Sequence, residues 1–226
     1  EDDRHRTPAR LAAECEDAQG LERLLTTVVF DRYQLVRVEN HEYRSPTAVI
    51  HRCRDLDHHH TAVAGSLAPP MLVLKMMKDK TSWMRELQSR SALMGAGVEA
   101  AVVSVTSAVC VCDDRAFREL HLPDTMARLT QRCPAAVVQN ARHQIAFDLM
   151  SEYPFCLCMP LAERNLLEVI QSERLAGLPI GLIGFTARKI AAAIDQLHRV
   201  GVVHGDIKPR NVVRGTDGVF KLIDFD

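Results

Sequence analysis

Several features that would place a protein in a special class are absent from this sequence of 226 residues. No uncharged apolar run reaches the roughly 18 residues of a membrane span, and the nearest, AAVVSVTSAVCVC at 100–112, is typical of a buried strand. The chain begins EDDRHR, which is not a secretory signal. A formal net charge of −1 without a Lys/Arg block removes the electrostatic basis for binding nucleic acid. We therefore expect no membrane span, no nucleic-acid partner and an intracellular, cytoplasmic location.

A disulfide framework is also absent. The seven cysteines are odd in number, and two pairs, Cys110 with Cys112 and Cys156 with Cys158, lie in apolar runs at strand spacing. A Cys-x-Cys pair could supply two zinc ligands, but this is not the usual zinc spacing. We expect buried free thiols, which fit a reducing compartment.

The apolar patterns of the first half predict strands. Alternation over 33–39 and 47–53 predicts a hairpin. The strand MLVLKMM (71–77) places Lys75 on the same face as Val73. A lysine in so apolar a strand is uncommon without a partner. Either the strand is an edge strand whose lysine reaches water, or the ammonium is directed at an anion.

A helix is expected directly after this strand. Thr81 or Ser82 can cap it, Trp83 lies on its apolar side, and Gly95 ends it. Glu86 lies within the helix. The importance of this glutamate depends on whether Lys75 is near.

The second half alternates between strands and helices. Charges, prolines and short helical patterns at 113–147 predict an insertion between two strands, the second of which is 155–159. A short helix ending at Gly177 and a long amphipathic helix over about 184–200 follow. VVR and VFKLIDF then predict a hairpin with its turn at 215–218.

Polar side chains gather around this hairpin. Asp206 and Asn211 in HGDIKPRN precede it, and Asp224 in LIDFD follows it. A hairpin folds the chain back, so the two carboxylates and the amide are expected to face one another. Such a cluster needs a cation, and hard oxygen ligands suit Mg²⁺, which typically arrives with the phosphates of a nucleotide.

HGDIKPRN followed by LIDFD resembles the catalytic loop and metal-binding motif of the eukaryotic protein kinase family, and MLVLK occupies the place of its phosphate-anchoring strand. The resemblance covers about residues 33–226. It implies an α+β, bilobal fold with a β-rich N-lobe that contains one key helix, followed by the first part of an α-helical C-lobe. The expected organisation is an N-terminal lead-in (1–32), an N-lobe with hinge (33–162) and a partial C-lobe (163–226).

The resemblance also implies roles for residues of the catalytic loop. Asp206 would accept or orient the proton of the attacking hydroxyl, and Lys208 would steady the transferring phosphoryl group. Asn211 and Asp224 would hold Mg²⁺. Lys208 followed by Pro209 is similar to the serine/threonine branch of the family. The implied reaction is transfer of the γ-phosphate of Mg-ATP to a protein hydroxyl.

Contacts to ATP are implied for a second set of residues. Lys75 would pair with the α and β phosphates and with Glu86. Val73 and Val213 would sandwich the adenine. The hinge, whose backbone recognises the base, would consist of Met159, Pro160, Leu161 and Ala162.

The chain departs from the family pattern at several positions. No glycine occurs between Gly20 and Gly65, so NHEYRSP stands in the place of the glycine-rich phosphate loop. Gly205 replaces the arginine that in the family binds a phosphorylated activation loop, so we do not expect control by phosphorylation of that loop. Asp226 replaces the final glycine of the metal-binding motif.

One assignment within the resemblance has an alternative. Glu86 is closer to Lys75 in the sequence than is usual in the family. Glu99 is therefore a second, weaker candidate for the lysine's partner.

Three functions remain open at this point. The full set of Lys75, Asp206, Asn211 and Asp224 favours an active serine/threonine kinase. The missing glycine-rich loop favours a pseudokinase that acts as a binding or scaffold module. The pattern HGD, Asn and IDFD also resembles small-molecule kinases of the aminoglycoside or choline type. Because we expect a fragment without the activation segment, we expect poor solubility or inactivity of this chain alone; no oligomeric state is indicated.

Overall fold

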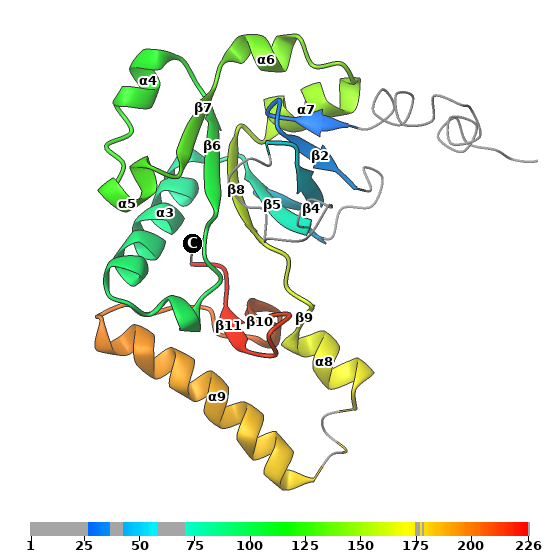
Figure 1. The fold of residues 1–226 in the computed structure, drawn as a ribbon, viewed down its shortest axis with the longest axis vertical. Helices are drawn as coiled ribbons and strands as arrows, with labels where there is room; N and C mark the ends of the chain where they lie inside the picture. The colour runs from blue at the N-terminus through cyan, green and yellow to red at the C-terminus, as the bar shows by residue number, and fades with distance from the viewer. Residues whose placement is uncertain (1–26, 37–42, 58–70, 175–176, 178, 226) are drawn as a thin grey trace, which may run out of the picture.

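The centre of the protein is an eight-stranded sheet (Figure 1). The structure, a computed structural model, describes residues 27–36, 43–57, 71–174, 177 and 179–225. The strand order is β1-β2-β4-β5-β8-β6-β7, with β3 paired to β4, and only β6 and β7 are parallel. The strands are β1 (Val28–Val29), β2 (Tyr33–Leu35), β3 (Tyr43–Arg44), β4 (Ala48–Asp55), β5 (Met71–Met77), β6 (Ser107–Val111), β7 (Thr130–Cys133) and β8 (Phe155–Pro160).

The predicted first hairpin is confirmed where it is described, because β2 and β4 pair antiparallel; residues 37–39 of the predicted strand lie outside the described residues. Strand β5 lies between β4 and β8 and is hydrogen-bonded to both. A strand in this position buries both faces, which explains its nearly uninterrupted apolar sequence. The alternative that β5 is an edge strand is therefore wrong.

Helix α3 (Lys80–Gly95) covers one face of the sheet and ends at Gly95, as predicted. Its N-cap is Asp79, whose carboxylate accepts from the amide of Ser82 at 2.6 Å, so the predicted cap at Thr81 or Ser82 is wrong. Aspartate is among the best N-cap residues because its short side chain reaches the free amides of the first turn. The buried indole of Trp83 donates to the Cys156 carbonyl at 3.1 Å and fixes the helix against β8.

The long apolar run at 100–112 is strand only in part. A 3-10 helix, η2 (Glu99–Ala101), and a single bridge from Val102 to Leu222 precede β6. The predicted insertion contains α4 (Asp114–Arg118), α5 (Asp124–Ala127), β7, α6 (Ala135–Gln139) and α7 (Gln144–Glu152). Strand β7 extends the main sheet, which the sequence pattern did not predict.

The lower part of the molecule consists of two helices and a small sheet, β11-β10-β9. Helix α8 ends five residues before the predicted Gly177, and α9 begins four residues before the predicted start at 184. The predicted second hairpin is confirmed, with Gly218 donating to the Gly215 carbonyl in its turn. The elements are β9 (Arg164–Asn165), α8 (Leu166–Ser172), α9 (Ile180–Arg199), the 3-10 helix η4 (Pro209–Asn211), β10 (Val212–Arg214) and β11 (Phe220–Leu222).

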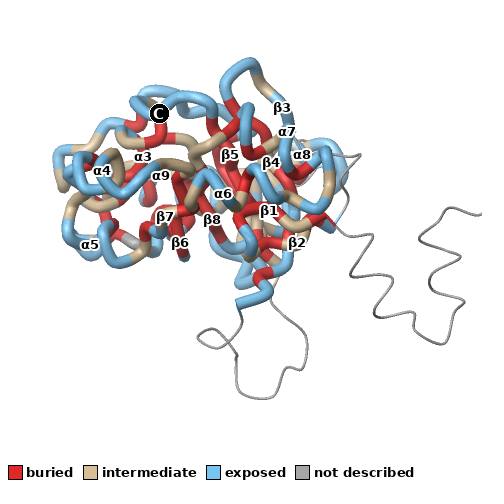
Figure 2. The backbone as a smooth tube through the Cα atoms, turned by 90° about the horizontal axis from the view of Figure 1, so that it is seen from above, coloured by how far each residue is buried: buried red, intermediate tan, exposed pale blue. Residues whose placement is uncertain are grey.

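Three apolar clusters hold these parts together. One lies on the face of the sheet covered by α6 and α7, and one lies on the face covered by α3 and α5. The third joins the end of α3 and η2 to α9 and the small sheet, through residues such as Leu93, Leu197 and Leu222. Figure 2 shows the buried stretches following the strands. The sheet-rich part and the helical part are thus packed together, and the predicted α+β fold is confirmed.

The predictions on the cysteines and on membrane spans can be compared with the described residues, whereas others fall outside them. The six described cysteines are free thiols, as predicted. Among the described residues, no helix combines the length and apolarity needed to cross a membrane. The lead-in up to residue 26 and Asp226 lie outside the described residues, and the domain boundaries stay predictions.

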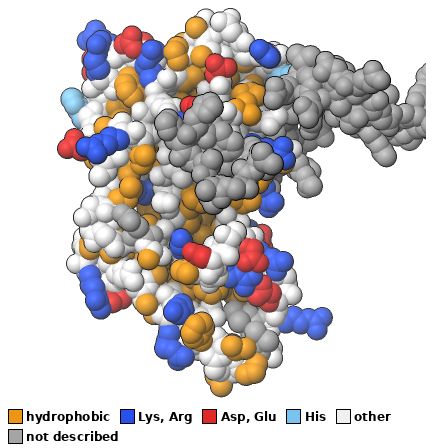
Figure 3. Space-filling model, viewed as in Figure 1, with side chains coloured by type: hydrophobic (Ala, Val, Ile, Leu, Met, Phe, Trp, Pro, Cys, Tyr) orange, Lys and Arg blue, Asp and Glu red, His pale blue; other side chains and the backbone are white. Residues whose placement is uncertain are grey.

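Apolar side chains are exposed where α9 begins, at the lower end of Figure 3, with Ile180 82% and Phe185 54% exposed.

Candidate active site

A cavity of about 440 Å³ lies between the main sheet and the loops beside the small sheet. Most of the predicted site residues line it: Val73, Lys75, Glu86, Met159, Pro160, Leu161, Ala162, Lys208, Asn211, Val213 and Asp224. The set comes from β5, α3, β8 and the residues directly after it, the loop 204–211, β10 and the segment after β11. Asp206 is not among the lining residues, although its neighbours in the loop are.

Lys75 lines this cavity and is 5% exposed. Its ammonium donates to Oε2 of Glu86 at 2.7 Å and to Oδ1 of Asp224 at 2.5 Å. The structure therefore brings together the strand lysine, the helix glutamate and the aspartate after the hairpin. The side chain of the alternative partner, Glu99, lies outside the described residues.

The charged side chains of this group keep one another ionised. Burial would lower the pKa of the Lys75 ammonium, but the nearby charges of Glu86 and Asp224 raise it above its ordinary value. Burial would likewise raise the pKa of Glu86, but the charges of Arg90 and Lys75 lower it. Both members of the central pair therefore stay charged at neutral pH.

The loop with the sequence HGDIKPRN, residues 204–211, forms its own network around Asp206. The carboxylate Oδ2 accepts from the Lys208 ammonium at 2.5 Å and from Nδ2 of Asn211 at 2.9 Å. The hydrogen bond from Lys208 lowers the pKa of Asp206, so the carboxylate is ionised at neutral pH. Gly205, just before it, has φ of 81°, a backbone conformation that favours glycine. This conformation supplies a local reason for glycine at a position where the family resemblance implies arginine.

The hairpin β10–β11 returns Asp224 to this loop. Val212 is paired with Leu222, and the amide of Ile223 donates to the Asn211 carbonyl at 3.0 Å. Asp224 itself has φ of 72°, in the left-handed region that aspartate adopts more readily than most residues. Asn211 and Asp224 are thus held close through the backbone, as the hairpin argument predicted.

The donor set suits a hard divalent cation that also has other ligands. Nδ2 of Asn211 donates to Asp206, which leaves the amide oxygen of Asn211 as the atom that could ligate a cation beside Asp224. Within the described ranges, no group of three or more His, Cys, Asp or Glu side chains could hold a metal ion by itself. Mg²⁺ commonly takes one or two carboxylates together with waters and phosphates, so the residues present fit that ion.

Side chains form the cavity wall where the family has its glycine-rich loop. Tyr43 on β3 lines the cavity, together with Ser45 and Thr47 from the turn before β4. The Ser45 hydroxyl accepts from the amides of Thr47 and Ala48 at 3.3 and 3.0 Å. These amides are therefore already hydrogen-bonded within the turn.

Sequence reasoning missed Arg90, which is 2% exposed and contacts Glu86 one helical turn away. It also missed the contact between the tilted rings of His204 and Phe225, whose centroids lie 4.7 Å apart. A signal for Arg90 was present, because residues four apart lie on the same helix face. A cation at that spacing after Glu86, on the side of the helix that carries Trp83, has to be paired when buried.

The cavity places a buried, ion-paired lysine beside apolar residues. Lys75 is the lysine, and Val73 and Val213 contribute apolar walls beside residues 159–162 at the end of β8. An apolar slot with a few convergent polar groups is the usual form of a small-molecule site.

Comparison with known proteins gives one family match. The family model described as "Protein kinase domain" matches residues 137–226. This segment runs from within α6 through the loop 204–211 to residue 226.

Several curated proteins are similar to part of the chain. Serine/threonine-protein kinase TIO of Arabidopsis thaliana is 26% identical over 93 residues, which cover 39% of this chain and 7% of that protein. Protein kinase dsk1 of Schizosaccharomyces pombe is 39% identical over 59 residues, covering 26% of this chain and 11% of the relative. Serine/threonine-protein kinase PknL of Mycobacterium tuberculosis is 32% identical over 100 residues, covering 44% of this chain and 23% of the relative. The matched segments thus span less than a quarter of each relative.

Proposed function

This chain is a member of the eukaryotic-like protein kinase family, and on that premise we propose that it transfers the γ-phosphate of Mg-ATP to a serine or threonine hydroxyl of a protein. The observation that carries the proposal is the convergence of Lys75, Glu86 and Asp224 at 2.7 and 2.5 Å in the cavity that Asn211 also lines. The kinase names of the relatives support a protein acceptor rather than a small molecule.

In this proposal each charged residue has one task. Lys75, held by Glu86, binds the α and β phosphates of ATP, and Asn211 and Asp224 hold the metal ion. Mg²⁺, when bound, neutralises negative charge on the phosphates. The ionised carboxylate of Asp206 accepts the hydrogen bond of the acceptor hydroxyl and orients it for attack. Lys208, 2.5 Å from that carboxylate, adds positive charge beside the transferring group.

The apolar residues position the base. Val73 on β5 and Val213 on β10 both line the cavity and would enclose the adenine. The backbone of the segment 159–162 would provide its hydrogen bonds. The free thiols of the described cysteines support a reducing, intracellular compartment for this reaction.

A second candidate, a pseudokinase that binds partners without phosphoryl transfer, is favoured by one observation. No glycine occurs from residue 21 to 64, and Tyr43, Ser45 and Thr47 line the wall where backbone would approach the phosphates. The two candidates differ in whether the phosphates of ATP fit below this wall.

The deciding experiment is transfer of labelled γ-phosphate from Mg-ATP to mixed protein substrates by the full-length protein. Asp206→Ala should reduce the rate by about a hundredfold or more, because the variant lacks the group that orients the hydroxyl. Asp195→Ala is the matched control, since Asp195 lies exposed on α9, is not among the residues that line the cavity, and pairs with Arg199. We expect the control to retain the wild-type rate.

The outcomes separate the candidates. Absence of phosphate transfer by both the wild type and Asp206→Ala would contradict the kinase proposal and favour the pseudokinase. Transfer to an aminoglycoside or to choline, tested in parallel, would favour the small-molecule alternative if protein substrates stay unlabelled.

A further inference from the structure

Arg210 is an exposed cation that the proposed reaction does not use. It lies in the 3-10 helix η4 and lines the cavity together with Lys208. Lys208 pairs with Asp206 at 2.5 Å, whereas Arg210 forms no ion pair with any residue that the structure describes. Its guanidinium is therefore available to a bound partner.

The residue after Arg210 ties it to the place where the acceptor hydroxyl is proposed to bind. Nδ2 of Asn211 donates to Oδ2 of Asp206 at 2.9 Å, and Asp206 is the residue proposed to orient that hydroxyl. An extended peptide advances roughly 3.3–3.6 Å per residue, so a side chain within about three residues of the acceptor can reach Arg210.

The acidic side chains that line the cavity are all engaged within the described part of the chain. They are Glu86, Glu163, Glu168 and Asp224. Glu86 and Asp224 both contact Lys75. Neither of these two carboxylates is therefore available to a cation of a substrate without loss of that ion pair.

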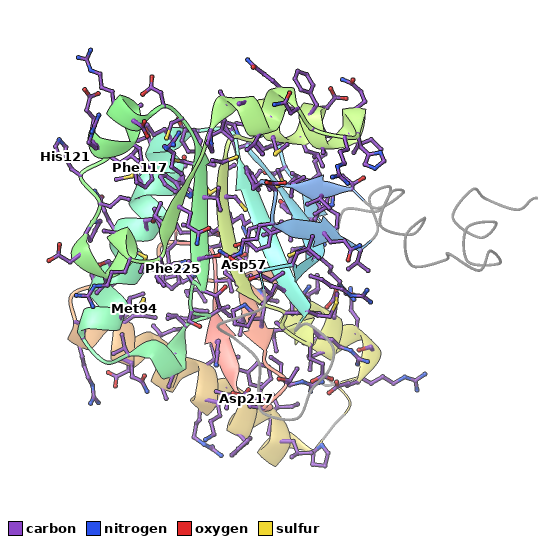
Figure 4. All side chains as sticks on the ribbon, turned by 45° about the horizontal axis from the view of Figure 1, so that its top comes forward. Asp57, Met94, Phe117, His121, Asp217 and Phe225 are labelled. Carbon is purple, nitrogen blue, oxygen red and sulfur yellow. The ribbon has the colours of Figure 1, made fainter. Side chains whose placement is uncertain are left out.

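The two exposed members of this acidic set belong to local structure. Glu163 accepts from Nε of Arg214 at 3.0 Å, and Glu168 accepts from the amide of Asn165 at 3.0 Å in a capping box. Asp217, in the turn between β10 and β11, does not line the cavity (Figure 4). A basic substrate would have to compete with these contacts, whereas an acidic substrate would meet an exposed arginine.

We propose that Arg210 is a specificity-determining residue that selects acceptor proteins with an anionic side chain close to the serine or threonine. The inference rests on the proposed function, because it assumes that the acceptor hydroxyl binds at Asp206. A planar guanidinium can bind both oxygens of a carboxylate. A phosphorylated side chain offers the same chemistry, so the shared requirement is an anionic group within about three residues of the acceptor.

Three matched serine peptides test the proposal in the full-length protein with Mg-ATP. They differ at one position beside the serine, which is Glu, Gln or Lys. We expect kcat/KM of the wild type to be about fivefold higher or more for the Glu peptide than for the Gln peptide. Arg210→Gln should make these two values equal without a change in KM for Mg-ATP.

A reversal of charge distinguishes recognition from damage to the loop. Arg210→Glu should favour the Lys peptide over the Glu peptide, which a merely distorted loop would not do. Arg199→Gln is the matched control, since Arg199 is 76% exposed on α9 and does not line the cavity. We expect this control to retain the wild-type preference for the Glu peptide.

A fourth peptide identifies the source of the anion. It carries phosphoserine in place of the Glu, and a preference for this peptide alone would support the anion site and assign it to phosphorylated rather than acidic sequences. Equal kcat/KM for all four peptides, a preference that survives Arg210→Gln, or a raised KM for Mg-ATP in that variant would overturn the proposal.

Binding separates this inference from the proposed function. If the wild type transfers no phosphate to any peptide, the proposed function fails, and fluorescence anisotropy of the labelled Glu peptide still decides the role of Arg210. Binding about fivefold tighter or more to the wild type than to Arg210→Glu would support the anion site. Equal affinity would overturn it.

Discussion

At the scale of single residues, Glu86 shows how strongly the site depends on buried charge. Its side chain is fully buried between Arg90 and Lys75. A buried ion pair contributes little net stability, but removal of one partner leaves a charge without compensation. The two cations beside Glu86 therefore make this carboxylate the sensitive member of the group.

We expect Glu86→Gln to lower the free energy of unfolding by about 3–5 kcal/mol, because it leaves two buried cations with one nearby carboxylate. Lys75→Met should cost less than half of that. In this variant Glu86 keeps Arg90, and Asp224, with 35% of its side chain exposed, can be hydrated. Urea unfolding followed by the fluorescence of Trp83, the only tryptophan, measures both values. Equal losses in the two variants would contradict this ranking.

At the scale of elements, the insertion between β6 and β8 supports helix α3. Met126 on α5 is fully buried in the apolar cluster that contains Trp83 and Leu87 of α3. The hydroxyls of Ser91 on α3 and Thr125 on α5 also share a hydrogen bond. The segment thus packs against the helix that carries Glu86.

Truncation of this contact should therefore destabilise the protein. We expect Met126→Ala to lower the free energy of unfolding by about 2–5 kcal/mol, because it leaves a cavity between α5 and α3. Ile145→Ala is the matched control, since Ile145 lies in the same insertion but is 47% exposed. Its change should stay below about 0.5 kcal/mol, as for most surface positions. A small effect of Met126→Ala would show that the insertion does not support α3.

At the scale of the whole molecule, the cavity lies where the sheet-rich part meets the loops of the helical part. Its lining comes from both parts, so a ligand that fills it contacts both. Ligand binding to the folded state alone stabilises that state by mass action. Nucleotide binding should consequently stabilise the protein as a whole.

Mg-ADP at a hundred times its Kd should raise the free energy of unfolding by about 2.7 kcal/mol. Removal of the metal with EDTA should abolish most of this gain, because Asn211 and Asp224 are proposed to hold Mg²⁺ between them and the phosphates. Thermal unfolding with Mg-ADP, with ADP plus EDTA and with neither measures it, and Asp195→Ala should behave as wild type. Equal stabilisation with and without the metal would argue against the proposed metal ligands.

Local patterns in the sequence determined much of this protein. Alternation and turn residues predicted both hairpins, because a hairpin depends on residues close in the chain. The places of Asn211 and Asp224 before and after the second hairpin predicted that they lie close together, for the same reason. The end of α3 at Gly95 also followed from local signals.

Only the tertiary structure decided features that depend on distant residues. Lys75 and Asp224 are 149 positions apart, and the central place of β5 depends on β8, which follows the insertion. The parallel addition of β7 and the burial of Arg90 against Phe225 likewise required the packed fold. Distant segments pair because the fold buries their complementary surfaces against each other. A single sequence segment contains only one of these two surfaces.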